Sequence, residues 1–316
     1  LPEPDPFAEV KLPRARLVAS AILSKWPEAT DQLLTGSAES LADFPIDHSV
    51  GPAAFRGGSV AADETLQAFL DERLHRYHED RSQPEADVAS GLSPWLHFGH
   101  ISASDVFSQL AMHENWNPDR LANHNKGSRK GWWGMSEPAE SFLDELITWR
   151  ELGYNFCWQR GDYDQFESLP EWAQVTLEEH SSDTRPHVYS LQQFESAQTH
   201  DELWNAAQTQ LVSEGRMHNY LRMLWGKKIL HWSESPREAM RIMIHLNNKY
   251  AVDGRDPNSY SGIFWVLGRY DRAWGPERPI FGKIRYMTSE NTARKFKVKD
   301  YIRKYSQPPG SPLESR

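Results

Sequence analysis

The 316-residue chain has a single cysteine, Cys157, so no intramolecular disulfide can form. It has no run of about 18 apolar residues that could span a bilayer, and its first thirty residues lack the apolar core of a signal peptide. A disulfide-stapled secreted scaffold and a membrane-bound protein are therefore excluded. We expect a soluble cytoplasmic protein, associated with the nucleoid in a prokaryote or located in the nucleus of a eukaryote.

Several catalytic motifs are missing as well. The sequence contains no GxxxxGK[ST] phosphate loop, no GxGxxG fingerprint, no HExxH pair and no GxSxG elbow. His97 and His100 lie three residues apart, but no third ligand is close in the sequence, so we predict no metal site. Triphosphate hydrolysis, a dinucleotide on a doubly wound sheet and serine hydrolase chemistry are not indicated.

The formal net charge of −9 argues against a protein that coats nucleic acid indiscriminately, because phosphate binding requires a broad positive field. One stretch near the C-terminal end is nevertheless strongly basic. It is either an ordinary solvated surface or a local face for nucleic acid. Its cationic residues are Arg278, Lys283, Arg285, Arg294, Lys295, Lys297, Lys299, Arg303 and Lys304.

Helical periodicity dominates the chain, and alternating strand patterns and internal repeats are lacking. From Asp63 onward one apolar stripe predicts a helix that ends before Pro84. Start signals at Ser93-Pro94, Ser102, Ser136 and Ser235-Pro236 predict further helices, and Thr199 and Glu202 read as a capping box. Gly215 predicts the end of a helix. Further helices are predicted over 217–232 and 235–250, and an irregular segment over 251–290. The stripe consists of Leu66, Phe69, Leu70, Leu74 and Tyr77.

The predicted fold class is therefore all-α. Residues 1–60 carry scattered prolines and one short amphipathic segment near 16–26, and they read as a linker or lead-in. Residues 61–316 form the predicted helical domain.

Six sequence blocks, spread in order over residues 63–304, resemble the photolyase/cryptochrome family, and the last block resembles its class II photolyases. This resemblance implies a helical FAD-binding catalytic domain that holds FAD in a U-shaped conformation. It does not extend to the N-terminal α/β antenna domain of full-length members, which we expect to be absent from this chain. The blocks are SGLSPWLHFGHIS (90–102), DELITWREL (144–152), LWNAAQ (203–208), MHNYLRMLWGKKIL (217–230), DGRDPNSYSGIFW (253–265) and ERPIFGKIRYM (277–287).

Candidate cofactor residues follow from the resemblance. A helix that starts at Ser93 offers free backbone N–H groups to a pyrophosphate, although an ordinary helix cap would read the same way. Arg222 and Asp253 are the candidate ion pair near the flavin ring, and Asn247 matches the amide that faces flavin N5. The whole implied set is Tyr77, Ser90, Leu92, Ser93, Arg150, Arg222, Asn247, Asp253 and Asp256.

Candidate substrate residues begin with Glu145 and Trp149, which lie four apart and so project from one helix face. A carboxylate beside a flat ring can hydrogen-bond and stack on a flipped-out base, or it can be a surface glutamate beside a half-buried tryptophan. The resemblance implies that Glu145 and Trp149 both contact the lesion. It adds Tyr220, Met223 and Trp265, and also Arg285, which would fill the gap in the duplex or neutralise a phosphate.

Tryptophan is abundant, with thirteen residues. Trp225 and Trp232 lie seven apart, so their rings share one helix stripe roughly 10 Å apart, and Trp204 on the preceding helix could pack between them. Such a stripe is either core packing or an electron path. The three positions match the class II tryptophan triad, which carries an electron from the surface to photoexcited flavin.

The implied function is light-driven repair of cyclobutane pyrimidine dimers in DNA, a carbon–carbon lyase reaction, by electron transfer from excited reduced FAD to the flipped-out lesion. We expect a monomer, with any antenna supplied by another piece of protein. Trp95 stands where the family more often has tyrosine. Two alternatives remain: a cryptochrome-like flavin photoreceptor without repair activity, and a helical DNA-binding or interaction module without flavin.

Overall fold

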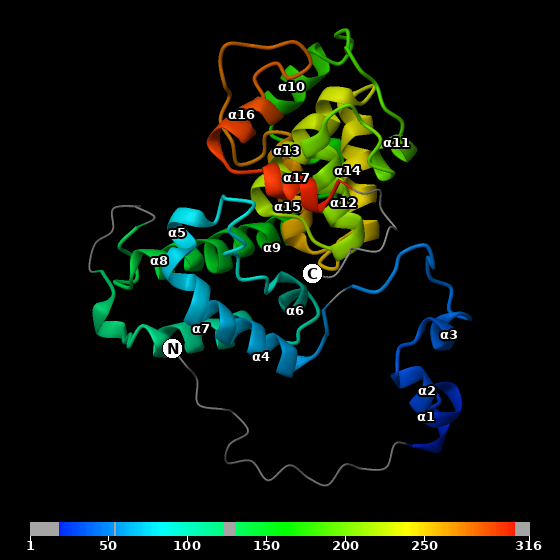
Figure 1. The fold of residues 1–316 in the computed structure, drawn as a ribbon, viewed down its shortest axis with the longest axis vertical. Helices are drawn as coiled ribbons and strands as arrows, with labels where there is room; N and C mark the ends of the chain where they lie inside the picture. Colours follow the sequence, from blue (N-terminus) through cyan, green and yellow to red (C-terminus); the bar gives the residue numbers. More distant parts are fainter. Residues whose placement is uncertain (1–18, 54, 123–129, 307–316) are drawn as a thin grey trace. The chain divides into compact units, whose positions relative to one another are not determined.

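The computed structural model describes residues 19–53, 55–122 and 130–306, and the chain divides into two compact units, Leu1–Gly51 and Pro52–Arg316 (Figure 1). The first unit holds three short helices, α1 (Ser20–Lys25), α2 (Asp31–Leu34) and α3 (Ala38–Leu41). No residue of α1 or α2 is buried. The predicted amphipathic segment near 16–26 overlaps α1, and its first residues lie outside the described part.

The second unit is built from helices in two layers (Figure 1). Within the described residues it contains no strand, and its only β-type pairing is an isolated bridge between Arg278 and Gly282. The first layer comprises α4 (Ser59–Ala68), α5 (Tyr77–Asp80), α6 (Ser93–His97), α7 (Ala103–His113), α8 (Glu137–Leu143) and α9 (Arg150–Gln159). The second comprises α10 (Glu171–Glu179), α11 (Leu191–Glu195), α12 (Glu202–Glu214), α13 (Asn219–Trp232), α14 (Pro236–Tyr250), α15 (Pro257–Val266), α16 (Ser289–Lys295) and α17 (Lys299–Lys304).

The apolar stripe predicted from Asp63 onward is confirmed, because all five of its members are buried. It does not lie on one regular helix. A π-helical turn (Phe69–Arg73) and a 3₁₀ turn (Leu74–Arg76) connect α4 to α5, and the helical path ends at Asp80, before Pro84 as expected. A second π-helical segment (Asp144–Trp149) joins α8 to α9, so the helix predicted from Ser136 continues beyond Leu152 to Gln159.

Three of the predicted N-caps are confirmed. The hydroxyls of Ser102, Ser136 and Ser235 each accept a hydrogen bond from a backbone N–H of the first turn that follows. The helix predicted to start at Ser93-Pro94 is confirmed as α6, but the expected caps at Ser93 and at Thr199 were wrong. Ser93 is the first residue of α6 and Leu92 is its N-cap, while the Ser93 hydroxyl bonds to the distant Asp253 carboxylate.

The α12 N-cap is Asp201, whose carboxylate accepts from the backbone N–H of Trp204. Thr199 lies outside the helix, where its hydroxyl donates to the Asn205 side chain, so the predicted capping box does not form. At the other end of α12, Gly215 has φ +68° and stops the helix as predicted. That left-handed conformation is strained for residues with a Cβ.

The segment 251–290 is more regular than predicted, since it contains α15. Asp256 caps this helix by accepting from the backbone N–H of Asn258. The helix packs closely on α9 at Gly153, where an added Cβ would lie 2.7 Å from the Asn258 side-chain oxygen. A larger residue at 153 would therefore push the two layers apart at this point.

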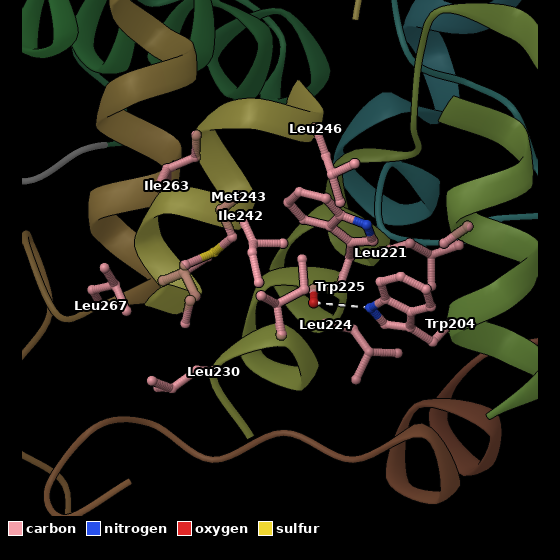
Figure 2. Close-up of a cluster of buried hydrophobic side chains, with 14 of the residues drawn as sticks. Trp204, Leu221, Leu224, Trp225, Leu230, Ile242, Met243, Leu246, Ile263 and Leu267 are labelled. Carbon is pink, nitrogen blue, oxygen red and sulfur yellow. Dashed lines mark hydrogen bonds between the residues drawn. The ribbon is translucent and has the colours of Figure 1, made fainter. Parts of the chain in front are cut away.

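Two hydrophobic cores hold the second unit together, one in each layer. The first is formed by α4, α7, α8 and the turns between them, with Leu66, Phe69 and Phe142 among its buried members. The second surrounds α13. Figure 2 shows side chains of α13, α14 and α15 packed around Trp225, with Trp204 reaching in from α12. No helix within residues 19–53, 55–122 and 130–306 is both long enough and apolar enough to cross a membrane.

Candidate functional site

A single cavity of about 1380 Å³ lies between the two layers of the second unit. Residues 83–96 contribute to its wall from the first layer, and α13 and α15 contribute from the second. Eight of the nine candidate cofactor residues line it; Asn247 does not. The eight are Tyr77, Ser90, Leu92, Ser93, Arg150, Arg222, Asp253 and Asp256.

The Asp253 carboxylate joins three distant segments at the cavity wall. It accepts a hydrogen bond from the Ser93 hydroxyl, and its other oxygen lies 3.9 Å from an Arg222 guanidinium nitrogen. Arg222 also donates to the side-chain oxygen of Asn247 at 3.4 Å, so Asn247, itself buried, contacts the cavity through Arg222. The predicted ion pair is present as a loose contact.

Asp256 and Arg150 occupy another part of the wall. Asp256 is buried, caps α15 and lies 3.3 Å from Nδ1 of His97. The Arg150 guanidinium stacks 4.4 Å from the centre of the Tyr154 ring and donates to the Tyr154 hydroxyl. The arginine head is thus oriented by an aromatic ring while it remains at the cavity edge.

Glu145, Trp149 and Trp265 also line this cavity. The first two belong to the π-helical segment between α8 and α9, and the Trp149 indole N–H donates to Asp144, five residues earlier, at 3.1 Å. The rings of Trp149 and Trp265 lie 4.3 Å apart, so this π-helical segment and α15 together present one aromatic wall.

The Glu145 carboxylate is paired with the Arg81 guanidinium. Burial lowers the pKa of Arg81, but the neighbouring Glu145 charge and hydrogen bond outweigh that effect, so the pKa of Arg81 is raised overall. Burial, followed by the charge of Glu145, raises the pKa of Tyr77 to about 12. Tyr77 is therefore a neutral phenol and Arg81 a full cation at pH 7. Sequence reasoning missed Arg81, since nothing local connects it to a residue 64 positions away.

Three candidate substrate residues, Tyr220, Met223 and Arg285, do not line the cavity. Tyr220 packs edge to face on Phe296, with ring centroids 4.5 Å apart. Met223 is half-buried against the second core. Arg285 is exposed and lies over the Trp274 ring at 5.2 Å.

The three candidate relay tryptophans are all buried in the second core. The Trp204 indole N–H donates to the backbone carbonyl of Trp225 at 3.0 Å (Figure 2), and the Trp225 indole donates to Gln208. Ring centroids of Trp204 and Trp232 lie 6.2 Å apart, so Trp204 contacts Trp232 through its ring and Trp225 through the Trp225 backbone. Trp232, the expected surface end, is only 1% exposed and lies under Tyr189 and His200.

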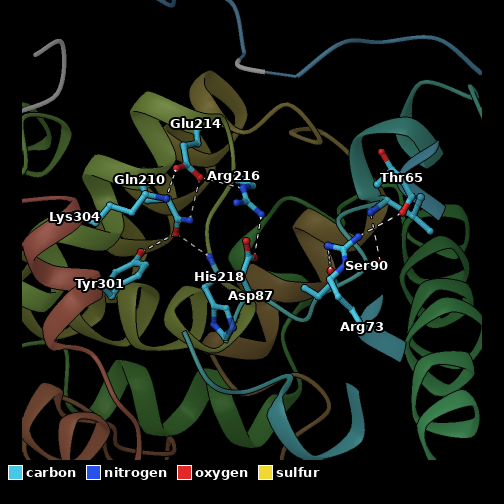
Figure 3. A network of polar contacts seen from close by, with 12 residues as sticks. Thr65, Arg73, Asp87, Ser90, Gln210, Glu214, Arg216, His218, Tyr301 and Lys304 are labelled. Atoms are coloured by element: carbon cyan, nitrogen blue, oxygen red, sulfur yellow. Dashed lines mark hydrogen bonds and ion pairs between the residues drawn. The ribbon is translucent and has the colours of Figure 1, made fainter. Parts of the chain in front are cut away.

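A polar network that sequence reasoning did not find borders the same cavity (Figure 3). Gln210 accepts from the Tyr301 hydroxyl and the backbone N–H of His218, and Glu214 binds Arg216 and Lys304. Burial lowers the pKa of His218 to about 4, which keeps its ring neutral. The network clamps α17 to α12 and the turn before α13.

Within the described residues, no cluster of three histidine, cysteine or carboxylate side chains is arranged to hold a metal ion. The cavity does suit a large anionic, partly aromatic ligand. Its lining carries charges of both signs, so an anion would have to lie beside cations such as Arg73, Arg150 and Arg222 and away from acids such as Glu85, Asp87 and Asp300; tryptophan rings also line it. A dinucleotide with two phosphates and a flat ring matches this donor set.

The sequence matches no protein-family model, but it is similar to curated proteins named deoxyribodipyrimidine photo-lyase. It is 43% identical over 267 residues to the one from Potorous tridactylus, covering 84% of this chain and 47% of that protein. It is 42% identical over 266 residues to the one from Methanothermobacter thermautotrophicus, covering 84% and 54%. The chain thus spans about half the length of these relatives.

Solved structures show the same fold at lower identity. A class III photolyase from Agrobacterium tumefaciens superposes with a TM-score of 0.58 at 22% identity, covering 90% of this chain and 49% of that one. A Synechocystis cryptochrome superposes with a TM-score of 0.60 at 18% identity, covering 85% and 49%. At these identities the similarity establishes a common helical architecture.

Proposed function

The chain belongs to the photolyase/cryptochrome family, and on this premise we propose that it binds FAD and catalyses light-dependent repair of cyclobutane pyrimidine dimers in DNA. One observation carries the proposal. Eight of the nine candidate cofactor residues and the aromatic wall of Trp149 and Trp265 line one continuous cavity. A donor and an acceptor bound there would lie within direct electron-transfer reach.

The family is generally flavin-dependent. Bound FAD would supply the light-excited electron donor, and the protein would supply binding, orientation and electrostatics. Arg222 and Asp253 would face the ring, with Asn247 held in place through Arg222. Ser90, Leu92 and Ser93 would form the phosphate loop, with Tyr77, Arg150 and Asp256 completing the surroundings.

The lesion would lie against Trp149 and Trp265. Their rings offer a stacking surface, and Glu145 offers carboxylate oxygens to the polar edge of a flipped-out pyrimidine. Because Arg81 is bound to Glu145, the carboxylate is already oriented before substrate arrives. Tyr220 and Met223 would contact the substrate only if the surrounding segments rearrange, since neither lines the cavity.

The path for reducing the flavin would run through Trp225, Trp204 and Trp232. Contacts support the two steps between the tryptophans: Trp204 is hydrogen-bonded to the Trp225 backbone and its ring packs near that of Trp232. All three indoles are shielded from water, which limits side reactions of an oxidised ring.

The DNA backbone would be held by exposed cations near the cavity. Lys295, Lys297 and Lys299 are exposed on and around α16 and α17, and Lys297 lines the cavity itself. Arg285 is an exposed candidate for the gap that the flipped lesion leaves in the duplex. We also propose that the second unit acts as a monomer where DNA is found, in a prokaryotic cytoplasm or a eukaryotic nucleus.

The test is recovery of ultraviolet base absorbance by an oligonucleotide containing a thymine dimer. Protein loaded with FAD and reduced anaerobically is mixed with the oligonucleotide under blue light, and a matched sample stays in darkness. Light-dependent recovery supports the proposal. Bound flavin without recovery would favour the photoreceptor alternative, although that alternative gives no reason for Glu145, Trp149 and Trp265 to share one wall.

A further inference from the structure

A buried ion pair lies against Trp232, the outermost ring of the proposed electron path. The Nζ atom of Lys228 is 3.1 Å from an Asp201 carboxylate oxygen and 5.0 Å from the centre of the Trp232 ring. Both charged side chains are 7% exposed. Replacing such a pair with apolar residues is often neutral or stabilising, so it is weak evidence for a stabilising role.

The Asp201 carboxylate is fixed from several sides. One oxygen accepts from the backbone N–H of Trp204 as the α12 cap, and the other accepts from the Ser289 hydroxyl at 2.6 Å. The negative charge is therefore held at a set distance from the Lys228 ammonium. Asp201 contacts the start of α12, which carries Trp204, and Lys228 lies over the ring of Trp232 on α13.

Other titratable groups at Trp232 are neutral near pH 7. His200 lies edge to face with it at 4.9 Å, and burial, followed by the neighbouring His187, lowers the pKa of His200. His231 lies at 6.3 Å, and burial and then Lys228 lower its pKa to about 4. Lys228 is thus the cation in contact with this ring, and Asp201 is its ion-pair partner. Two more charged groups act on this cluster at longer range: Glu290 on Lys228 and Asp201, and Arg185 on His231.

We propose that the Lys228–Asp201 pair sets the oxidation potential of Trp232, and so determines how long an electron vacancy stays on the outermost tryptophan. The inference rests on the proposed electron path. A ring that has lost an electron is positively charged, so Lys228 raises its energy and Asp201 lowers it. In a buried site with a low effective dielectric, these effects are larger than in water.

The electrons balance as follows. On the proposed path, Trp225 would give one electron to bound flavin, Trp204 would restore Trp225, and Trp232 would restore Trp204. One positive charge then remains on Trp232 until a thiol in solution returns an electron. The Lys228–Asp201 pair acts on the electron transfer from Trp232 to Trp204. It changes the equilibrium fraction of electron vacancies that lie on Trp232 instead of Trp204.

The test uses Lys228→Met, Asp201→Asn and the double variant. The lifetime of the tryptophan radical absorbance after a light flash is measured on FAD-loaded protein. We expect Lys228→Met to lengthen it about tenfold, since the vacancy is stabilised, and Asp201→Asn to shorten it by a similar factor. Asparagine keeps the helix cap. The double variant, which has lost both charges, should return close to the native lifetime.

A purely structural role would shorten the lifetime in all three variants, and that result, or unchanged lifetimes, would overturn the proposal. Arg237→Met is the matched control. Arg237 also lies over an aromatic ring, that of Phe166 at 4.3 Å, and pairs with Glu167 and Glu178, but it neither lines the cavity nor lies over a relay tryptophan. Its lifetime should stay at the native value.

Chemically reduced protein separates this inference from the proposed function. Dithionite supplies the flavin with electrons directly, so dimer repair under blue light then needs no tryptophan relay. Repair that is equal in native protein and variants, together with opposite lifetime shifts, supports both proposals. Opposite shifts without any repair would overturn the proposed function alone, and repair without shifts would overturn the role of the ion pair alone.

Discussion

Trp149, at the end of the π-helical segment before α9, and Trp265 on α15 lie with their ring centroids 4.3 Å apart and their planes inclined by 32°. Tyr270 meets both rings edge on, at about 6 Å from each. Stacked rings need about 3.5 Å on each face, so no base fits between these two. A substrate base would therefore stack on the free side of the pair.

Replacing Trp149 or Glu145 with alanine should weaken dimer repair and leave FAD bound. Base–aromatic stacking contributes about 1–3 kcal/mol, so we expect lesion affinity to fall at least about fivefold for Trp149→Ala. The measurements are lesion affinity and the yield of absorbance recovery. Trp158→Ala is the control, since that α9 residue is 86% exposed. Unchanged repair in both pocket variants would contradict the proposed lesion site.

Asp253→Asn should reduce FAD retention, because Ser93 and Arg222 lose the shared charge that connects them across the cavity. The check is the ratio of flavin absorbance to protein absorbance after purification and dialysis. Asp162→Asn removes a carboxylate from an exposed pair with Arg160 and should keep the native ratio. Equal flavin content in the two variants would show that the Asp253 carboxylate does not contribute to FAD binding.

A variant with glutamine at Lys295, Lys297 and Lys299 should bind DNA more weakly and with less salt dependence. Each lost phosphate contact lowers the slope of log affinity against log salt by about 0.9. Binding of duplex DNA at several salt concentrations measures this slope. Arg241→Gln, on α14, removes an exposed cation already paired with Glu238 and should leave the slope unchanged. An unaltered slope in the triple variant would place DNA on another face.

Gly153→Ala should destabilise the second unit by about 1–3 kcal/mol. The added methyl group would approach the Asn258 side chain to 2.7 Å, which outweighs the gain in helix propensity. Gly262→Ala on α15 is the control, because its added methyl group meets nothing within 4 Å and alanine favours a helix by about 1 kcal/mol. Urea unfolding measures both; a stabilised Gly153→Ala would refute the close approach.

Stability should fall as the pH drops from 6.5 towards 4. The pKa of His218 is lowered by burial from 6.5 to about 4 in the folded protein, so the unfolded chain binds a proton first and is favoured over this interval. Above pH 6.5 the ring is neutral in both states and has no effect. Urea unfolding at pH 7 and pH 5 should show a smaller difference for His218→Gln. An identical difference would show that His218 does not titrate in this way.

Local physical chemistry explains which helices could be predicted. The caps at Ser102, Ser136 and Ser235 and the stop at Gly215 depend on one hydroxyl or one backbone conformation within a few residues. The apolar stripe from Leu66 to Tyr77 depends only on helical spacing. The six family blocks were also readable, since each is a continuous string of residues.

Only the tertiary structure decided what brings the site together. Ser93, Arg222 and Asp253 meet, Arg81 pairs with Glu145, and Lys228, which lies over Trp232, pairs with Asp201, because helices distant in sequence pack on shared cores. Tertiary contacts also explain the two caps that were predicted wrongly. Asp201, and not Thr199, caps α12, and the Ser93 hydroxyl bonds to Asp253 instead of its own helix. A polar side chain bonds to the partner that packing places nearest, and that partner is not encoded in the residues beside it.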